Sequence, residues 1–267
     1  MRPVYWPSPV AETYEAEWRE VVADPEPWEL DDAAYPLDIV RPYLRPGDRV
    51  ADLGCGPGRV LKWLAARGHR CVGLDREAAA LASLAGHPVV QADVRQLPFR
   101  PGSFDLLLAL SVLDHVPDAP ARVEVLRQLE VMVRPGGLAV LVVGHQGAWS
   151  HWWEQGIVMN AALRRLLRKP AQARYISSVV FRRGDIEQDL RGTGWQVLEQ
   201  RCLGARMTLH TYLPWLRAQT LTRREQRNPR LYRLTPFGEW VHARIARWAW
   251  SHPRILYVLQ RPAAGSA

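Results

Sequence analysis

The segment RVADLGCGPG, residues 49–58, joins a short apolar run to a cluster of three glycines. The apolar part predicts a buried strand over 49–53, and the apolar spacing that follows predicts a helix over 60–67. Glycines between a strand and a helix let the backbone turn tightly and approach a ligand that a Cβ atom would exclude. The segment therefore predicts a ligand-binding turn at the carboxyl end of a strand.

The same alternation of apolar runs and helical segments continues on the carboxyl side of this turn. Further strands are predicted over 71–74, 89–92, 104–110, 138–143, 195–203 and 255–260, and further helices over 77–85, 119–133 and 185–191. The run RPGG, residues 134–137, predicts a helix stop and a turn. Strands separated by helices of this length indicate an α/β fold: a Rossmann-like, doubly wound, mostly parallel seven-stranded sheet.

The spacing of the glycines distinguishes between two kinds of nucleotide ligand. The glycines lie at 54, 56 and 58 and residue 59 is arginine, whereas the dinucleotide fingerprint needs GxGxxG. Asp52, just before this cluster, would repel a pyrophosphate and attract a cation. Asp75 ends the second strand, where it can accept both ribose hydroxyls, and Asp93 follows the third, where it can accept from an adenine amino group. S-adenosylmethionine (SAM), with a sulfonium, an amino group and no phosphate, fits this pattern better than NAD.

Five motifs in order, VADLGCGPG, VGLD, QADVRQLPF, FDLLLALSVLDHVPD and VRPGG, resemble the class I SAM-dependent methyltransferases. Among these enzymes the chain is most similar to the small-molecule branch that includes the quinone-biosynthesis methylases, the methyltransferase type 11-like proteins. The resemblance covers residues 45–145 strongly and 176–203 weakly, through the pattern GDIEQDLRGTGWQVLEQ. It implies a SAM-binding set without a metal. That set is Asp52, Gly54, Cys55, Gly56 and Gly58 for the methionine end, Asp75 at the ribose, Asp93 and Val94 at the adenine, the backbone carbonyl of Leu110 for the methionine amino group, and Arg76 as a further cofactor-binding residue.

Methyl transfer is an in-line displacement, so a protein accelerates it largely by holding the acceptor close to the methyl carbon. A general base is needed only where the acceptor, such as a phenol, must lose a proton. His115 follows the fourth predicted strand, at the mouth where the acceptor should lie. His115 is therefore our candidate base. The alternative is a structural role, in which its side chain only closes the loop after the strand. His145 and His151 follow the fifth strand and are further candidates.

The net charge of +8 is unevenly placed along the 267 residues. Residues 1–50 carry five basic and eleven acidic residues, a net of −6, whereas residues 151–267 carry twenty and seven, a net of +13. We expect residues 1–37 to form an N-terminal helical cover containing Tyr14 and Trp18. Residues 38–267 are expected to form the methyltransferase domain, with helical lid insertions at about 146–176 and 205–252.

The segment 205–252 holds nine arginines, two glutamates and four tryptophans. It is compatible with a lid packed on the domain, with a basic amphipathic helix that reaches an anionic or amphipathic substrate at a membrane surface, or with RNA binding. RNA is less favoured, because the resemblance offers no Asn/Asp-Pro-Pro-aromatic loop after the fourth strand.

The remaining composition indicates a cytoplasmic protein of the size of an enzyme, and the resemblance implies a small-molecule acceptor. The three cysteines are scattered and form neither a disulfide framework nor a zinc site. The N-terminus has no continuous apolar signal region, and the longest apolar runs are too short for a transmembrane segment. A nucleic-acid methyltransferase that uses the basic C-terminal region, and a SAM-binding protein without catalysis, stay open as alternatives.

Overall fold

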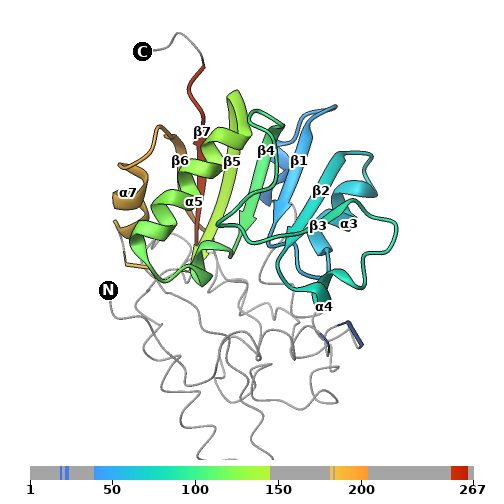
Figure 1. Cartoon of the computed structure of the whole chain (residues 1–267). Helices are drawn as coiled ribbons and strands as arrows, with labels where there is room; N and C mark the ends of the chain where they lie inside the picture. Colours follow the sequence, from blue (N-terminus) through green and yellow to red (C-terminus); the bar gives the residue numbers. More distant parts are fainter. Residues whose placement is uncertain are drawn as a thin grey trace, which may run out of the picture.

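The computed structural model describes residues 39–144, 181–182, 184–203 and 254–263, together with residues 19, 22 and 23. Its strands form one seven-stranded sheet in the order β3-β2-β1-β4-β5-β7-β6 (Figure 1). The strands are β1 (Arg49–Leu53), β2 (Arg70–Asp75), β3 (Val89–Gln91), β4 (Phe104–Leu110), β5 (Val133–Gly144), β6 (Gln196–Leu203) and β7 (Arg254–Gln260). Each of the seven lies where the apolar runs predicted one.

The sheet is mostly parallel, as expected. β1 pairs in parallel with β2 and with β4, β2 pairs with β3, and β4 pairs with β5 in the same way. Only β7 runs against its neighbours, β5 and β6. The order of the strands reverses between β1 and β4, and ligands of open α/β sheets bind outside the carboxyl ends of the strands at such a switch point.

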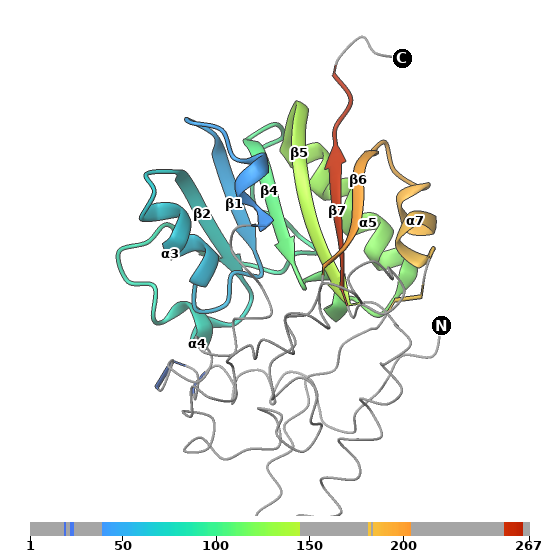
Figure 2. The ribbon, with the colours of Figure 1, turned by 180° about the vertical axis from the view of Figure 1, so that it is seen from behind.

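Helices cover both faces of the sheet, which makes the fold doubly wound. The α-helices are α3 (Arg59–Ala65), α4 (Ala78–Leu81), α5 (Ala119–Met132) and α7 (Asp185–Leu190), and two 3-10 turns are η3 (Arg41–Tyr43) and η4 (Leu113–His115). α5 and α7 pack on one face through Val125, Leu126 and Ile186. α3 packs on the other face through Val60 and Leu64, as the view from behind shows (Figure 2).

Two elements differ from the expected bounds. The helix expected over 77–85 is the single turn α4, where Ser83 Oγ donates a hydrogen bond to the Ala80 carbonyl and so competes with helix continuation. The turn expected over 134–137 is part of β5. The backbone N–H of Gly136 donates to the Arg261 carbonyl, and that of Arg261 donates to the Gly137 carbonyl. This pairing extends the strand through the prolyl-glycyl run.

Several expectations concern residues outside the described part of the chain. They are the N-terminal cover with Tyr14 and Trp18, the insertions at 146–176 and 205–252, and His145 and His151. The membrane and RNA alternatives depend on the second insertion. Among the residues that the structure does describe, no helix is both long and apolar enough to span a membrane.

Candidate functional site

The glycine turn after β1 lies at the carboxyl end of the sheet and is held against β2. The backbone N–H of Cys55 donates to the Leu74 carbonyl at 3.0 Å, and that of Gly58 donates to the Cys55 carbonyl at 2.9 Å. Gly54, Gly56 and Gly58 have φ angles of 65°, 52° and 78°. Because residues with a Cβ atom rarely adopt this left-handed conformation, the three glycines are required by the path of the backbone.

The turn also approaches the end of β4 very closely. A Cβ atom on Gly54 would lie 2.7 Å from Cγ2 of Val112. Val112 follows β4, so this approach joins the two strands at which the sheet reverses its order. The glycine turn is therefore packed into the switch point between β1 and β4.

Two buried carboxylates stand beside this turn. Asp52 is 2% exposed and Asp75 is 7% exposed. Asp75 Oδ2 accepts from the Gly56 N–H at 2.8 Å and Oδ1 accepts from the Glu77 N–H at 2.9 Å, so its carboxylate ties the glycine turn to the end of β2. Asp52 Oδ2 is buried and has no hydrogen-bond partner among the described residues.

Burial, and then the charge of Asp75, raises the pKa of Asp52 to about 7. A carboxylate in this position would be stabilised by an added positive charge, because an opposite charge favours the ionised form. The two carboxylates thus make the carboxyl end of β1 and β2 a place for a ligand that bears a cation. The structure brings Asp52 and Asp75 together at this edge of the sheet.

The third predicted carboxylate, Asp93, lies after β3 and forms an ion pair with Arg95. Its Oδ1 and Oδ2 accept from Arg95 Nε and Nη2 at 2.9 and 2.6 Å, and Oδ1 also accepts from the Arg95 N–H at 2.8 Å. The side-chain hydrogen bonds of Arg95 lower the pKa of Asp93 below its usual value. Val94 adjoins it and is half-buried against the core.

Arg76 joins the ends of β2 and β3. Its carbonyl accepts from Gln91 Nε2 at 3.1 Å, and its Nε lies 2.8 Å from Glu77 Oε1. The residues expected at the methionine end, the ribose and the adenine therefore lie along one edge, after the neighbouring strands β1, β2 and β3 in that order.

The carboxyl end of β4 carries the remaining expected residues. Leu110 ends the strand, and Ser111 after it is the one described residue other than glycine with a positive φ angle, 58°. A non-glycine residue in this conformation stores strain, which is commonly found at functional sites. His115 closes η4 with its side chain exposed. The candidate base is thus at the carboxyl edge, as predicted.

Two further residues shape this end of the site. Asp114 is buried, accepts from the Gly144 N–H at 2.7 Å, and has its pKa raised by that burial. Arg122 on α5 is buried and donates to the carbonyls of Val116 and Pro117. Neither residue was predicted from the sequence to have a role. A signal existed for Arg122, which continues the apolar stripe of α5 formed by Val125, Leu126 and Leu129.

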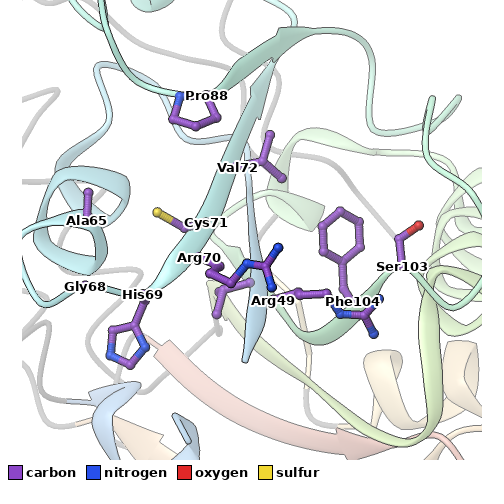
Figure 3. Close-up of a pocket in the computed structure, with 11 residues that line it drawn as sticks. Arg49, Ala65, Gly68, His69, Arg70, Cys71, Val72, Pro88, Ser103 and Phe104 are labelled. Atoms are coloured by element: carbon purple, nitrogen blue, oxygen red, sulfur yellow. The ribbon is translucent and has the colours of Figure 1, made fainter. Parts of the chain in front are cut away.

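A hollow of about 530 Å³ lies elsewhere, at the amino-terminal ends of β1, β2 and β4. Arg49, His69, Arg70 and Phe104 line it, and Figure 3 shows Arg49 and Arg70 side by side. It has no carboxylate in its lining and is at the opposite edge from the glycine turn. We therefore place the functional site at the carboxyl edge and not in this hollow. The described residues contain no group of three His, Cys, Asp or Glu that could hold a metal ion.

The part of the chain that carries this site is similar to known methyltransferases. Residues 51–141 match the methyltransferase domain family. A ubiquinone biosynthesis O-methyltransferase of Pseudomonas aeruginosa (strain UCBPP-PA14) is 38% identical over 104 residues, which cover 36% of this chain and 44% of that protein. An uncharacterized methyltransferase of Mycobacterium sp. (strain JLS) is 43% identical over 120 residues, 40% of this chain and 46% of that protein. The matches thus span less than half the length of these relatives.

Solved structures confirm the fold beyond the matched region. A SAM-dependent methyltransferase from Methanosarcina mazei has a TM-score of 0.56 at 15% identity, covering 86% of this chain and 98% of that one. Geranyl diphosphate C-methyltransferase from Streptomyces coelicolor A3(2), crystallised with S-adenosyl-L-homocysteine, has a TM-score of 0.52 at 16% identity, covering 84% and 74%. These TM-scores establish the architecture, and sequence identities this low do not identify the substrate.

Proposed function

We propose that this chain, whose residues 51–141 match the methyltransferase domain family, binds SAM. It would transfer the methyl group of SAM to a small-molecule acceptor. The observation that carries the proposal is the buried carboxylate Asp52 beside Asp75 and the glycine turn. An unpartnered buried carboxylate oxygen is costly unless a ligand supplies a donor or a positive charge. The sulfonium and amino groups of SAM provide positive charge, and SAM has no phosphate for these carboxylates to repel.

Different residues of this edge would contact different parts of the cofactor. Asp52, Gly54, Cys55, Gly56 and Gly58 would hold the methionine end, together with the carbonyl of Leu110. Asp75 and Arg76 would hold the ribose, where each Asp75 oxygen keeps a lone pair beyond its one backbone hydrogen bond. Asp93 and Val94 would hold the adenine. When bound, SAM would supply an electrophilic methyl group on a positively charged sulfonium, which leaves as a neutral thioether.

The chain's own contribution to catalysis is positioning of the acceptor and removal of its proton. The relatives named for O-methylation suggest a hydroxyl acceptor. Methylation of a hydroxyl would form an O–C bond, break the sulfur–methyl bond of SAM and release one proton, which the exposed imidazole of His115 would accept. A wrong placement of about 1 Å can lower such a rate about 100-fold, so the rigidity of the turn around His115 matters.

The first test is calorimetric binding of S-adenosylhomocysteine to the full chain and to Asp75→Asn. Loss of one charge-assisted hydrogen bond is worth about 1.5–3 kcal/mol, so we expect the variant to bind about 10- to 100-fold more weakly. Asp48→Asn is the matched control, because Asp48 also accepts from a backbone N–H, that of Arg45, but at the opposite edge of the sheet. Wild-type protein that does not bind this ligand would overturn the proposal.

The second test is transfer of radiolabelled methyl groups from SAM to a panel of phenols, hydroxylated aromatic acids, amines and bulk RNA. We expect label in a hydroxylated aromatic compound, and its loss in His115→Gln with binding of S-adenosylhomocysteine retained. Label only in RNA would favour a nucleic-acid methyltransferase. Binding of S-adenosylhomocysteine without labelling of any acceptor class would indicate a SAM-binding protein without catalysis.

A further inference from the structure

A buried arginine contacts the turn that carries the candidate base. Arg122 is 1% exposed and lies one turn into α5, after the N-cap Asp118. Its Nη1 donates to the Val116 carbonyl at 3.2 Å and to the Pro117 carbonyl at 2.9 Å. These carbonyls belong to the two residues that directly follow η4 and His115. The guanidinium thus holds the carboxyl-terminal side of the turn.

A second contact orients the guanidinium itself. Arg122 Nε donates to Asp189 Oδ2 at 2.7 Å, and Asp189, on α7, is only 5% exposed. The ring of Phe181 lies against the guanidinium, with 5.0 Å from the guanidinium carbon to the ring centroid. Arginine's planar fork of donors is pre-organised for such fixed geometry, which a lysine ammonium does not reproduce.

Asp114, the middle residue of the turn, holds it to the end of β5. Its Oδ1 accepts from the Gly144 N–H at 2.7 Å, and the Gly144 carbonyl accepts from the Phe181 N–H at 3.0 Å. Phe181 therefore connects the end of β5 with the guanidinium of Arg122. Directional hydrogen bonds therefore hold the turn Leu113–His115 at Asp114, within it, and at the two carbonyls that directly follow it, and Phe181 contacts both sets of partners.

Stability alone does not explain an ion pair in this place. Removing two charges from water costs free energy, and well-packed apolar residues often serve a buried position equally well or better. Arg122 continues a stripe of apolar residues on α5, so a leucine or methionine would suit the packing. What an apolar residue lacks is a donor for the carbonyls that follow His115.

We propose that Arg122 is a positioning residue that fixes the turn bearing His115 at the carboxyl end of β4, with Asp189 fixing Arg122 in turn. The inference rests on the proposed function only for the role of His115. The placement of the turn is a property of the protein without any ligand, so it can be tested separately.

The experiment compares four proteins: wild type, Arg122→Met, the double variant Arg122→Met with Asp189→Leu, and the control Arg127→Met. Arg127 also lies on α5 and donates to a carbonyl, that of Gly192, but its contact is exposed and remote from η4. The imidazole signals of the eight histidines are recorded by NMR with ¹³C-labelled histidine, and His115 is assigned with His115→Gln. Urea unfolding and binding of S-adenosylhomocysteine are measured on the same samples.

We expect Arg122→Met to lose stability, because Asp189 is left as an uncompensated buried charge, and to shift or broaden the His115 signal. The double variant should recover the stability, since both charges are gone, but not the His115 signal. Binding of S-adenosylhomocysteine should stay within about twofold in both. With an acceptor from the labelling panel, kcat should fall about 10- to 100-fold while KM for SAM is unchanged.

Two results would overturn the inference. One is a double variant whose His115 signal returns to the wild-type position together with its stability, which would make the arginine a packing element only. The other is an equal displacement in Arg127→Met, which would make the effect a general property of α5. Should Arg122→Met fail to fold, the double variant alone decides. Absence of S-adenosylhomocysteine binding in wild type would refute the proposed function and leave the NMR comparison valid.

Discussion

The close approach of Gly54 to Val112 gives a quantitative test of how the glycine turn is built. Gly54→Ala would introduce a Cβ atom 2.7 Å from Val112 Cγ2 at a φ angle of +65°. Val112 is buried and β-branched, so its side chain has little freedom to move aside. The matched control is Gly68→Ala, because Gly68 has a φ angle of +76° and no atom within 4 Å of an added Cβ.

Both substitutions place alanine in the left-handed region, at a cost of about 1–2 kcal/mol. Only Gly54→Ala adds overpacking, which costs about 1–3 kcal/mol. Urea unfolding should therefore show a loss of about 1–2 kcal/mol for Gly68→Ala and about 2–5 kcal/mol for Gly54→Ala.

A second substitution relieves the contact. Val112→Ala removes both Cγ atoms and leaves only the Cβ of residue 112, at 3.7 Å from the new Cβ, which is ordinary van der Waals contact. The double variant should be more stable than the sum of the two single changes by about 1–3 kcal/mol. Equal losses for the two glycine variants, or strict additivity in the double variant, would refute the close packing of the turn against β4.

Two further predictions concern charge and helix capping. Since the pKa of Asp52 rises from 3.8 to about 7 on folding, the folded chain holds a proton that the unfolded chain has lost between these pH values. The free energy of unfolding should thus fall as the pH rises through this window, by up to about 1.36 kcal/mol per pH unit. Asp52→Asn should lack this slope when urea unfolding is measured at several pH values. Equal slopes in the wild type and the variant would contradict the argument from burial. Asp118 Oδ2 accepts from the Ala121 N–H at 3.0 Å at the start of α5, so Asp118→Ala should lose about 0.5–2 kcal/mol in the same assay, whereas Asp118→Ser should retain most of the stability.

The strands were predictable because parallel strands buried on both faces read as continuous apolar runs. The start of β5 was not, because Pro135, Gly136 and Gly137 are local turn signals. Their backbone pairs with Arg261, far along the chain, and no local pattern reports such a partner. The short length of α4 was also missed, although its cause is local. Ser83 Oγ donates to the Ala80 carbonyl, but a serine at this position does not by itself predict that a helix ends there.

The carboxyl edge with the candidate site was predictable to a similar extent. Asp52 and Asp75 end neighbouring parallel strands, so they had to meet at one edge of the sheet. The engagement of Asp93 by Arg95 was not foreseen, although the two are close in sequence. The contacts of Asp114 with Gly144 and of Arg122 with Asp189 join residues 30 and 67 positions apart, and depend on how α5, β5 and α7 come together.

The placement of β7 between β5 and β6 has a consequence for how the chain reaches this structure. β6 is synthesised before β7, yet it contacts the sheet through β7, and β5 also pairs with β7 along its outer edge. Until β7 arrives, β5 exposes an apolar edge of the kind that pairs with other chains. Pairing of strands that are this far apart in the sequence is slow, and the delay favours aggregation during folding. The yield of folded protein should therefore depend on residues 254–260 more steeply than their share of the final core suggests.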